Sequence, residues 1–362
     1  MDSLQPPPPL KGRGAVSNPT GRFETETREA VDEGWDLDES DLPPLRTQVT
    51  IERPKTIIAR NTSPDVPFDR SINPYRGCEH GCVYCFARPT HAYLGLSPGL
   101  DFESRLFAKP DAARLLEREL SKPGYRPKTL QLGSNTDPYQ PIEKEHRITR
   151  GVLEVLARFN HPVSITTKSP LVCRDMDILG PMAEKGLAAV AVSVCTLDAK
   201  LARTLEPRAP RPGKRLEAIR TLSQAGIPVA VMVAPMIPVL NDQEMEAILE
   251  KAAEAGARAA GIILLRLPFE LKDLFSEWLA VHAPDKAAHV LSQVRETRGG
   301  GLNHAEFKIR MKGTGPRAEM LAKRFSLACK RFGLTGGQAS GFELDVCRFS
   351  PPPKIGDQLR LL

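Results

Sequence analysis

Three cysteines in one short loop are the residues of this chain most suited to chemistry. Cys78, Cys82 and Cys85 follow a C-x3-C-x2-C spacing within the stretch N-P-Y-R-G-C-E-H-G-C-V-Y-C-F-A-R. Gly77 and Gly81 stand beside them, and glycine allows the positive φ angles with which a short loop folds tightly. We therefore expect the three thiolates to converge on one centre. Clustered thiolates select iron–sulfur clusters or zinc, and three cysteines leave one metal position without a protein thiolate.

Two other uses of these cysteines stay open at this point. A structural zinc site would take His80 or His91 as its fourth ligand, although zinc sites usually pair two C-x2-C units and the chain has no second one. A disulfide framework fits less well, because seven cysteines are an odd number and the N-terminus shows no secretory signal.

The composition bounds the class of protein. Hydrophobic residues make up 41% of the 362-residue chain, which is enough for a full core. No apolar run approaches the roughly 20 residues that span a bilayer, so we expect a cytoplasmic protein with no membrane partner. The net charge of +6 permits a nucleic-acid partner but does not require one.

Helix and strand signals alternate between residues 65 and 270. Near-continuous apolar strands that alternate with helices predict a parallel sheet whose outer side is covered. Six strands are too few for a closed eight-stranded barrel, and function is expected at their carboxyl ends, as in other α/β barrels. The expected strands are 68–75, 129–132, 162–167, 188–194, 228–234 and 260–265, and the helices between them are 111–120, 149–159, 175–185, 212–225 and 241–255.

Three further segments flank this region. Residues 1–45 are rich in proline, glycine and charge and predict a mostly disordered arm, in which residues 11–24 either dock onto the body, touch a substrate or stay disordered. Two β-prone runs within residues 46–64 predict a hairpin that leads into the barrel. Residues 271–362 predict a C-terminal cap with helices at 272–282, 285–296 and 317–332.

Small and polar residues follow the second expected strand. Gly133, Ser134, Asn135 and Asp137 lie where this strand opens into the mouth of the barrel. Their oxygens are the acceptors that a bound ammonium group needs in a pocket that contains little water. A polar turn built on Asn, Asp and Pro is the alternative, but this polar run is longer than a turn requires.

The third and fourth strands also end in polar groups. Lys168 is awkward at the end of a buried strand unless it meets an anion or snorkels to solvent. Ser193 is expected to face the same mouth. Cys195 lies two positions later, so strand alternation places it on the same face, where it is either a hydrogen-atom donor or a small buried residue.

The cysteine loop, with Tyr84 just before the third cysteine, resembles the signature of the radical S-adenosylmethionine (SAM) superfamily. Together with the stretch L-Q-L-G-S-N-T-D-P-Y-Q-P-I-E, the T-K-S strand end and the serine strand, it resembles the spore photoproduct lyase-like branch, often called DNA repair photolyase-like. The N-terminal K-G-R-G-A-x-x-N-P-x-x-R-F-E patch is similar to a bacterial radical SAM family within that branch.

This resemblance implies a fold, cofactors and partners. The fold is a partial (βα)6 barrel over residues 65–270, and the cofactors are a [4Fe–4S] cluster and SAM. An electron donor such as flavodoxin or ferredoxin is implied as a partner. Carried over by motif, the cluster ligands are Cys78, Cys82 and Cys85, and the residues that contact SAM are Tyr84, Ser134, Lys168 and Ser193. Gly133, Asn135 and Asp137 belong to the strand-end stretch that, in radical SAM proteins, approaches the SAM amino group.

Glu206 and Arg208 follow the fourth strand in the sequence L-E-P-R, and we expect them to bind the SAM ribose, the SAM carboxylate or the substrate. In the lyase branch, a hydrogen-donating cysteine precedes the SAM-binding serine. Gln131, Leu132 and Gly133 occupy that stretch here, so reversal of a thymine dimer by the same mechanism is not implied.

The resemblance implies an enzyme that cleaves SAM reductively and abstracts hydrogen from a substrate that the sequence does not identify. Nucleic acid, peptide and small molecule all stay open as substrates. The alternative is an iron–sulfur or zinc module for binding or electron transfer without SAM chemistry. Such a module has no need for the polar groups at three successive strand ends.

Overall fold

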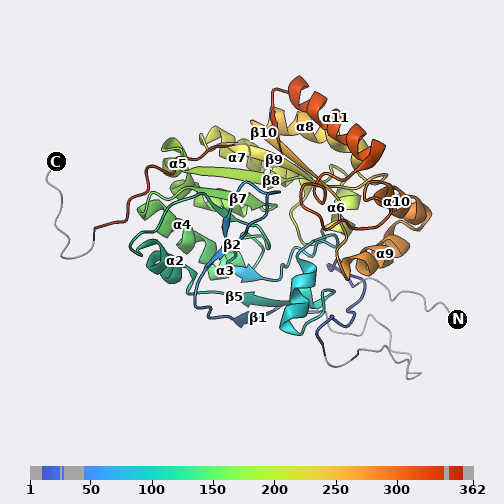
Figure 1. Cartoon of the computed structure of the whole chain (residues 1–362), viewed down its shortest axis with the longest axis horizontal. Helices are drawn as coiled ribbons and strands as arrows, with labels where there is room; N and C mark the ends of the chain where they lie inside the picture. Colours follow the sequence, from blue (N-terminus) through green and yellow to red (C-terminus); the bar gives the residue numbers. More distant parts are fainter. Residues whose placement is uncertain (1–9, 25–26, 28–44, 338–341, 354–362) are drawn as a thin grey trace.

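The computed structural model describes residues 10–24, 27, 45–337 and 342–353. Its main sheet has the strand order β11-β10-β9-β8-β7-β6-β3-β2, and every neighbouring pair is parallel except β2 and β3. Figure 1 shows β7, β8, β9 and β10 of this sheet side by side. The six expected barrel strands are consecutive neighbours in this sheet, which confirms the α/β partial-barrel fold. They are β3 (Arg70–Ile72), β6 (Leu130–Leu132), β7 (Val163–Thr167), β8 (Ala188–Ser193), β9 (Val229–Met236) and β10 (Ala259–Leu264).

The two faces of the sheet carry side chains of different size. On β9, Val229, Val231 and Val233 belong to the main hydrophobic cluster, which also contains the buried sides of the covering helices. Ala230 and Met232 point the other way and form a smaller cluster with alanines of β8 and β10. Because side chains alternate along a strand, bulky residues pack under the helices while small residues leave room on the opposite face.

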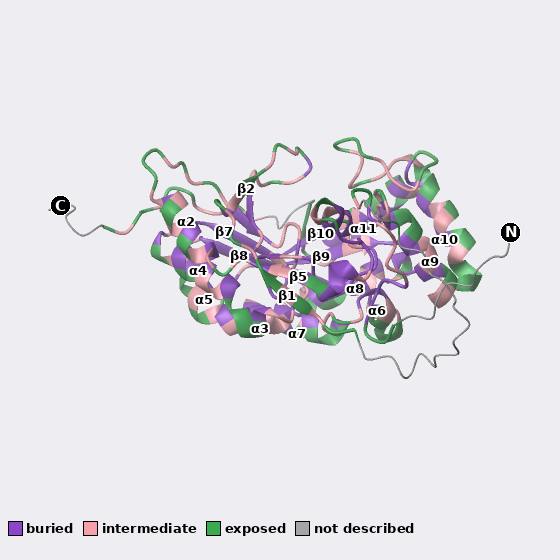
Figure 2. Cartoon of the chain, turned by 90° about the horizontal axis from the view of Figure 1, so that it is seen from below, coloured by how far each residue is buried: buried purple, intermediate pink, exposed green. Residues whose placement is uncertain are grey.

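Helices cover one face of the sheet, as expected from the alternating pattern. Figure 2 shows buried strands above helices whose outward sides are exposed. These helices are α2 (Ala112–Leu120), α4 (Ile148–Arg158), α5 (Met176–Glu184), α7 (Pro212–Gln224) and α8 (Met245–Glu254), with the short α3 (Glu143–His146) and α6 (Ala199–Leu205) and the 3-10 turns η3 (Pro170–Asp175) and η4 (Asp242–Glu244) between them.

None of the helices in the described part of the chain is both long enough and apolar enough to cross a membrane.

The hairpin predicted within residues 46–64 does not form. β1 (Gln48–Ile51) instead runs parallel to β5 (Arg105–Ala108), which also pairs with β4 (Tyr75–Arg76) in a small second sheet. β2 (Ile58–Arg60) runs antiparallel to β3 and extends the main sheet. The prediction was wrong because the two runs pair with other strands, β1 with β5 and β2 with β3.

The C-terminal part contains the three expected helices, α9 (Leu271–His282), α10 (Pro284–Glu296) and α11 (Gly315–Arg331). α9 and α10 pack beside the cysteine loop in a second hydrophobic cluster, in which the Trp278 indole N–H donates to the Thr204 carbonyl at 3.0 Å. α11 packs against α8, and the strand β11 (Thr335–Gly337), which was not predicted, pairs with β10. The C-terminal part therefore adds a strand to the main sheet as well as helices that pack against the rest of the protein.

The N-terminal arm is described only in part, because residues 1–9, 25–26 and 28–44 lie outside the described ranges. Residues 10–24 pack onto the body of the protein, where Ala15 and Val16 are buried. Of the three possibilities left open for residues 11–24, the structure therefore supports docking.

His161 generates a prediction about acid stability. Its ring is fully buried, with Nε2 lying 2.9 Å from the Tyr125 hydroxyl, and burial lowers its pKa to about 4. Protons then bind the unfolded chain, in which the pKa is near 6.5, before they bind the folded one, so stability falls as pH drops from about 6.5 to 4.

We expect His161→Phe to remove about 2 kcal/mol of the loss in unfolding free energy between pH 7 and pH 5. Urea denaturation of both proteins at the two pH values measures this difference. An equal loss in both proteins would show that His161 does not titrate as described.

Candidate active site

The cysteine loop has little regular structure, so its shape comes from turns and from contacts with its surroundings. Gly77 and Gly81 have φ angles of 72° and 68°, and a Cβ on Gly77 would lie 2.8 Å from the Phe102 carbonyl oxygen. The Cys78 N–H donates to that carbonyl at 3.0 Å, and the Cys85 N–H donates to the Cys82 carbonyl at 3.2 Å. Both glycines are therefore required by conformation, as the sequence predicted.

A buried ion pair holds the loop from beneath. Arg88, at the start of the 3-10 helix η2 (Arg88–Leu94), donates to the carbonyls of Cys82 at 2.8 Å and Gly81 at 3.1 Å. The same guanidinium pairs with Glu103 of α1 (Asp101–Ser104) at 2.5 Å, and both side chains are fully buried. This guanidinium thus fixes the backbone of the central cysteine.

The N-terminal segment 10–24 lies over the same loop. The N–H groups of Gly14 and Ala15 donate to the two Glu103 carboxylate oxygens at 2.9 Å and 2.8 Å, and Arg13 donates to the Glu103 carbonyl at 2.9 Å. A Cβ on Gly14 would lie 1.8 Å from the Gly81 carbonyl oxygen. The segment approaches the loop so closely that only glycine fits at this position.

One cavity joins the cysteine loop to the carboxyl ends of the strands. It is lined by Tyr84 and by residues that follow β6, β7 and β8, as well as by apolar residues of β9 and β10. Ten of the thirteen predicted site residues line it, and three do not: Cys195, Glu206 and Arg208. The ten are Cys78, Cys82, Tyr84, Cys85, Gly133, Ser134, Asn135, Asp137, Lys168 and Ser193.

The strand end after β6 is closely packed. Gly133 has a φ of 83°, and a Cβ there would lie 2.1 Å from the Thr166 carbonyl oxygen on β7. The next two residues are held by Asn73, whose amide nitrogen donates to the Ser134 hydroxyl at 3.3 Å and whose amide oxygen accepts from the Asn135 N–H at 3.1 Å. The polar run is therefore fixed in place at the cavity wall.

Asp137 links two strand ends and the cysteine loop. Its carboxylate accepts from the Thr167 hydroxyl at 2.6 Å and the Lys168 N–H at 2.8 Å, and it lies 3.4 Å from His80 Nδ1. Burial alone would raise the pKa of Asp137, but the His80 charge and these hydrogen bonds lower it to about 2. This carboxylate has partners within the protein, so its part in the site is to position the strand ends.

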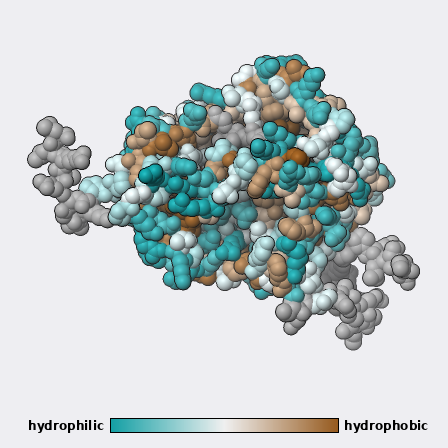
Figure 3. Space-filling model, in the orientation of Figure 1, coloured by the Kyte–Doolittle hydropathy of each residue, from teal (hydrophilic) through white to brown (hydrophobic). Residues whose placement is uncertain are grey.

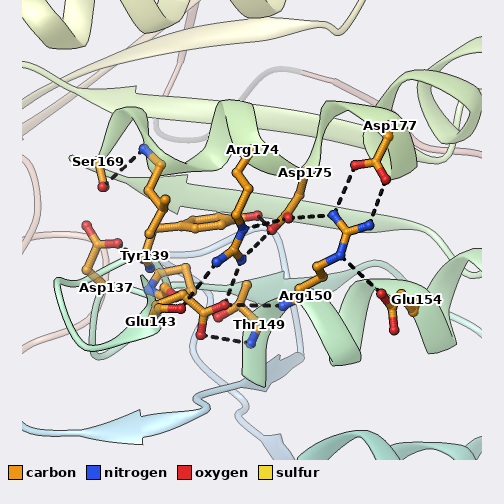
Figure 4. A network of polar contacts seen from close by, with 12 residues as sticks. Asp137, Tyr139, Glu143, Thr149, Arg150, Glu154, Ser169, Arg174, Asp175 and Asp177 are labelled. Atoms are coloured by element: carbon orange, nitrogen blue, oxygen red, sulfur yellow. Dashed lines mark hydrogen bonds and ion pairs between the residues drawn. The ribbon is translucent and has the colours of Figure 1, made fainter. Parts of the chain in front are cut away.

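A polar network supports the turn that follows Asp137 (Figure 4). Arg174 pairs with Glu143 at 2.8 Å and with Asp175 at 2.9 Å, while the Tyr139 hydroxyl donates to Asp175 at 3.1 Å. Arg150 of α4 joins the same network through Asp175 at 2.9 Å. The turn is thereby tied to the helices behind the sheet, which keeps its cavity side rigid.

A second buried network lies behind Tyr84. Glu206 accepts a hydrogen bond from the Tyr84 hydroxyl, pairs with the buried Arg215 and lies 3.7 Å from the Lys168 ammonium. Burial alone would raise the pKa of Glu206, but Arg215 and Lys168 lower it to about 2. The anion that Lys168 meets in the structure is therefore Glu206, and the ammonium also lies 5.8 Å from the Tyr84 ring centroid.

The other two predicted residues that miss the cavity have different surroundings. Arg208 pairs with Glu79 at 2.7 Å beneath the cysteine loop. Cys195 is fully buried and does not line the cavity, and because β8 ends at Ser193, strand alternation does not determine the side on which it lies.

Sequence analysis gave no site role to Arg266, which lines the cavity just after β10. A signal for it exists in the chain, since a charged residue directly follows the apolar run I-I-L-L, as Lys168 follows its own strand. Phe86 also lines the cavity and was missed, because an aromatic residue in a loop carries no pattern of its own.

The donor set fits the iron–sulfur cluster that the cysteine spacing suggests. The three thiols are free and line one cavity. Within the described residues, no three His, Cys, Asp or Glu side chains are placed to hold one metal ion together. His91, proposed above as a zinc ligand, does not line the cavity, and its Nε2 lies 3.0 Å from the Arg105 carbonyl oxygen. Of the two residues proposed as a zinc ligand, only His80 lines the cavity beside the cysteines, and its Nδ1 lies 3.4 Å from Asp137.

Comparison with known proteins agrees with this geometry. The family model described as Radical SAM superfamily matches residues 72–252. The chain is 39% identical over 233 residues to the uncharacterized protein Rv2578c of Mycobacterium tuberculosis, covering 64% of this chain and 67% of that one. It is 31% identical over 173 residues to the uncharacterized protein MJ0683 of Methanocaldococcus jannaschii, covering 48% and 62%.

Solved structures of spore photoproduct lyase share the fold. One mutant of that enzyme superimposes with a TM-score of 0.58 and 15% identity over 82% of each chain. Another, with bound AdoMet and dinucleoside spore photoproduct, gives a TM-score of 0.57 and 14% identity over 82% of each chain. At this level of identity the likeness concerns the fold.

Glu206 generates a prediction about stability. Replacing it by Gln leaves the buried Arg215 guanidinium without its counter-charge, and breaking a buried pair in this way costs about 3–5 kcal/mol. We expect Glu206→Gln to lower the unfolding free energy of the apoprotein by this amount in urea denaturation.

Glu217→Gln is the matched control, since Glu217 forms an exposed pair with Lys214 on α7 at 2.7 Å, and such pairs contribute about 0–1 kcal/mol. If the two substitutions had equal effects, Glu206 would not be the counter-charge that the buried network needs.

Gly14 generates a prediction about the N-terminal segment. Because Gly14→Ala places a methyl group against the Gly81 carbonyl, we expect residues 10–24 to leave the loop and trypsin to cleave after Arg13 at least tenfold faster. Mass spectrometry of timed digests identifies this cleavage. Gly180→Ala on α5, where an added Cβ meets nothing within 4 Å, is the control. Equal cleavage rates would contradict the described packing.

Proposed function

Because the chain belongs to the radical SAM superfamily, a family of enzymes, we propose that Cys78, Cys82 and Cys85 hold a [4Fe–4S] cluster with which it cleaves SAM reductively. The observation that carries this proposal is the single cavity that the three cysteines share with the polar ends of β6, β7 and β8. A metal module without SAM chemistry would leave those polar strand ends without a role.

The proposed chemistry divides between cofactor and protein. When bound, the reduced cluster supplies the electron that splits a C–S bond of SAM into methionine and a 5′-deoxyadenosyl radical. The protein binds and orients the reactants and excludes water. Ser134 and Asn135 offer oxygen acceptors for the SAM ammonium group, while Ser193 offers a hydroxyl on the neighbouring side of the cavity.

Lys168 and Tyr84 shape the cavity wall on the β7 side. Glu206 holds both of them, so the lysine charge is fixed next to the cavity and partly balanced. In the proposed site this ammonium attracts the SAM carboxylate, and Glu206 acts on SAM only through these two residues. Arg208, paired with Glu79, contributes through the backbone of the cysteine loop.

The fate of the substrate radical is proposed to differ from that in spore photoproduct lyase. Gln131 occupies the stretch in which that branch carries its hydrogen-donating cysteine, and its amide donates to the Thr166 hydroxyl at 3.1 Å and to the Leu132 carbonyl at 2.6 Å. An amide in this setting does not donate a hydrogen atom as a thiol does. A nucleic acid is one candidate substrate, since one of the structures with this fold contains a dinucleoside.

A one-electron donor such as flavodoxin or ferredoxin completes the proposal. The cytoplasm, where thiols stay reduced, suits both the cluster and this partner.

Reconstitution tests the proposal directly. We expect the anaerobically reconstituted protein, with dithionite and SAM, to give a reduced-cluster paramagnetic resonance signal that SAM perturbs, and to release 5′-deoxyadenosine. Cys82→Ala should abolish both, because one of the three thiolate ligands is lost.

Cys347→Ala is the matched control, because that cysteine is exposed and lies outside the cavity lining. Tight zinc binding, with no cluster and no cleavage of SAM in the unaltered protein, would overturn the proposal in favour of a structural module.

A further inference from the structure

Arg266 is a cavity residue that the site described so far does not use. It is the second residue after the end of β10, and its guanidinium carbon lies 4.7 Å from the ring centroid of Phe86, the residue next to Cys85. Its side chain is half-buried, and each of its nitrogens keeps access to the cavity or to solvent. The aromatic ring therefore supports one face of a guanidinium whose N–H groups remain available.

The charges of the other cavity-lining cations are already balanced. Lys168 lies 3.7 Å from Glu206, and His80 lies 3.4 Å from Asp137. Within the described residues, Arg266 has neither a hydrogen bond nor an ion pair. A half-buried cation without a counter-charge is costly, and an incoming anion would offset that cost.

Neighbouring groups raise the positive potential around Arg266. Burial and the charge of Arg310 lower the pKa of Arg266 to about 10, while Asp65 and Cys85 act in the opposite direction, and at this value Arg266 still carries its charge near neutral pH. The two carboxylate oxygens of Asp65 accept from Arg310 and from the Lys308 N–H at 2.5 Å each. Among the described residues, Asp65 therefore forms its ion pair with Arg310 and not with Arg266.

The backbone that carries Arg266 is rigid. The buried Arg298 donates to the carbonyls of Leu264 at 2.7 Å and Leu265 at 2.8 Å, and the Leu265 N–H donates to the Met236 carbonyl at 2.9 Å. Arg298 begins the glycine-rich stretch R-G-G-G at residues 298–301, which follows α10. That stretch therefore fixes the position from which Arg266 reaches the cavity.

Arg266 lies across the cavity from the polar strand ends proposed to bind SAM. In the sheet order, β10 is three strands from β7, a separation of roughly 14 Å at about 4.8 Å per strand. Between Ser193 at the end of β8 and Arg266, the wall contains the apolar residues Met232, Ala234 and Ile263 of β9 and β10. A ligand bound on this side would contact the apolar residues along its length and the Arg266 guanidinium at one end.

We propose that Arg266 forms an anion subsite that binds a carboxylate or phosphate group of the substrate. A guanidinium offers paired N–H donors that match either group, whereas a lysine would act only as a point charge. This inference rests on the proposed function, because it takes the substrate to lie in the same cavity as SAM. It identifies the substrate as a molecule with an oxyanion next to an apolar portion.

Binding of small probes to the reconstituted, SAM-saturated protein tests the subsite. Phenyl phosphate and benzoate each combine an apolar ring with one of the two anions, and benzamide is the uncharged control. We expect at least one anionic probe to bind in anaerobic titration calorimetry, with a dissociation constant raised at least tenfold in Arg266→Gln and less in Arg266→Lys. Phenyl phosphate binding alone would assign a phosphate-bearing substrate, and benzoate binding alone a carboxylate.

Arg220→Gln is the charge-matched control, because Arg220 is exposed on α7 and does not line the cavity. Iron content and thermal unfolding of each variant show whether it is folded and loaded. The proposal is overturned if neither anion binds the unaltered protein, if Arg266→Gln binds the probes as tightly, or if its SAM affinity falls as much as its probe affinity. Release of 5′-deoxyadenosine by the unaltered protein in the same preparation separates these failures from failure of the proposed SAM chemistry.

Discussion

The placement of the cysteine loop depends on the buried ion pair between Arg88 and Glu103. A loop without regular structure cannot hold three thiols by its own backbone hydrogen bonds, so its carbonyls need partners from elsewhere. Arg88 supplies them from below, and Glu103 fixes Arg88 while it accepts from the N–H groups of Gly14 and Ala15 above. Two charges without access to water are tolerated here because hydrogen bonds surround both of them.

Local patterns in the sequence predicted most of the fold. They also predicted those parts of the site whose residues lie close together in the sequence. Apolar, β-branched strands between helices predicted the six parallel strands, because burial on both faces requires them. The cysteine spacing and the small and polar residues at the strand ends predicted nine residues of the cavity, since parallel strands bring their carboxyl ends to one edge, and the family resemblance implied the tenth, Tyr84. These signals need no knowledge of which segments meet at a distance.

What the sequence did not reveal depends on distant partners. Nothing local indicates that Glu206 meets Arg215 and Tyr84 rather than a ligand, or that residues 48–51 pair with β5 rather than with residues 58–60. Strand alternation could not be extended to Cys195, because the strand ends at Ser193. Propensity and spacing do not show which segments and side chains meet in the fold, nor at which residue a strand ends.

The surface and the cavity differ in how they distribute charge. On the face shown in Figure 3, hydrophobic residues occur in small groups between hydrophilic ones, as is usual for a protein surface. Inside the cavity, small residues on one face of the sheet create space, and the charged groups at its edges are paired within the protein at Lys168 and His80 but not at Arg266. Since a water-poor site strengthens every charge within it, the proposed subsite at Arg266, which has no ion pair among the described residues, would favour one orientation of an anionic ligand. The fold thus supplies a general scaffold. Discrimination among substrates would depend on the side chain of Arg266, near the end of β10.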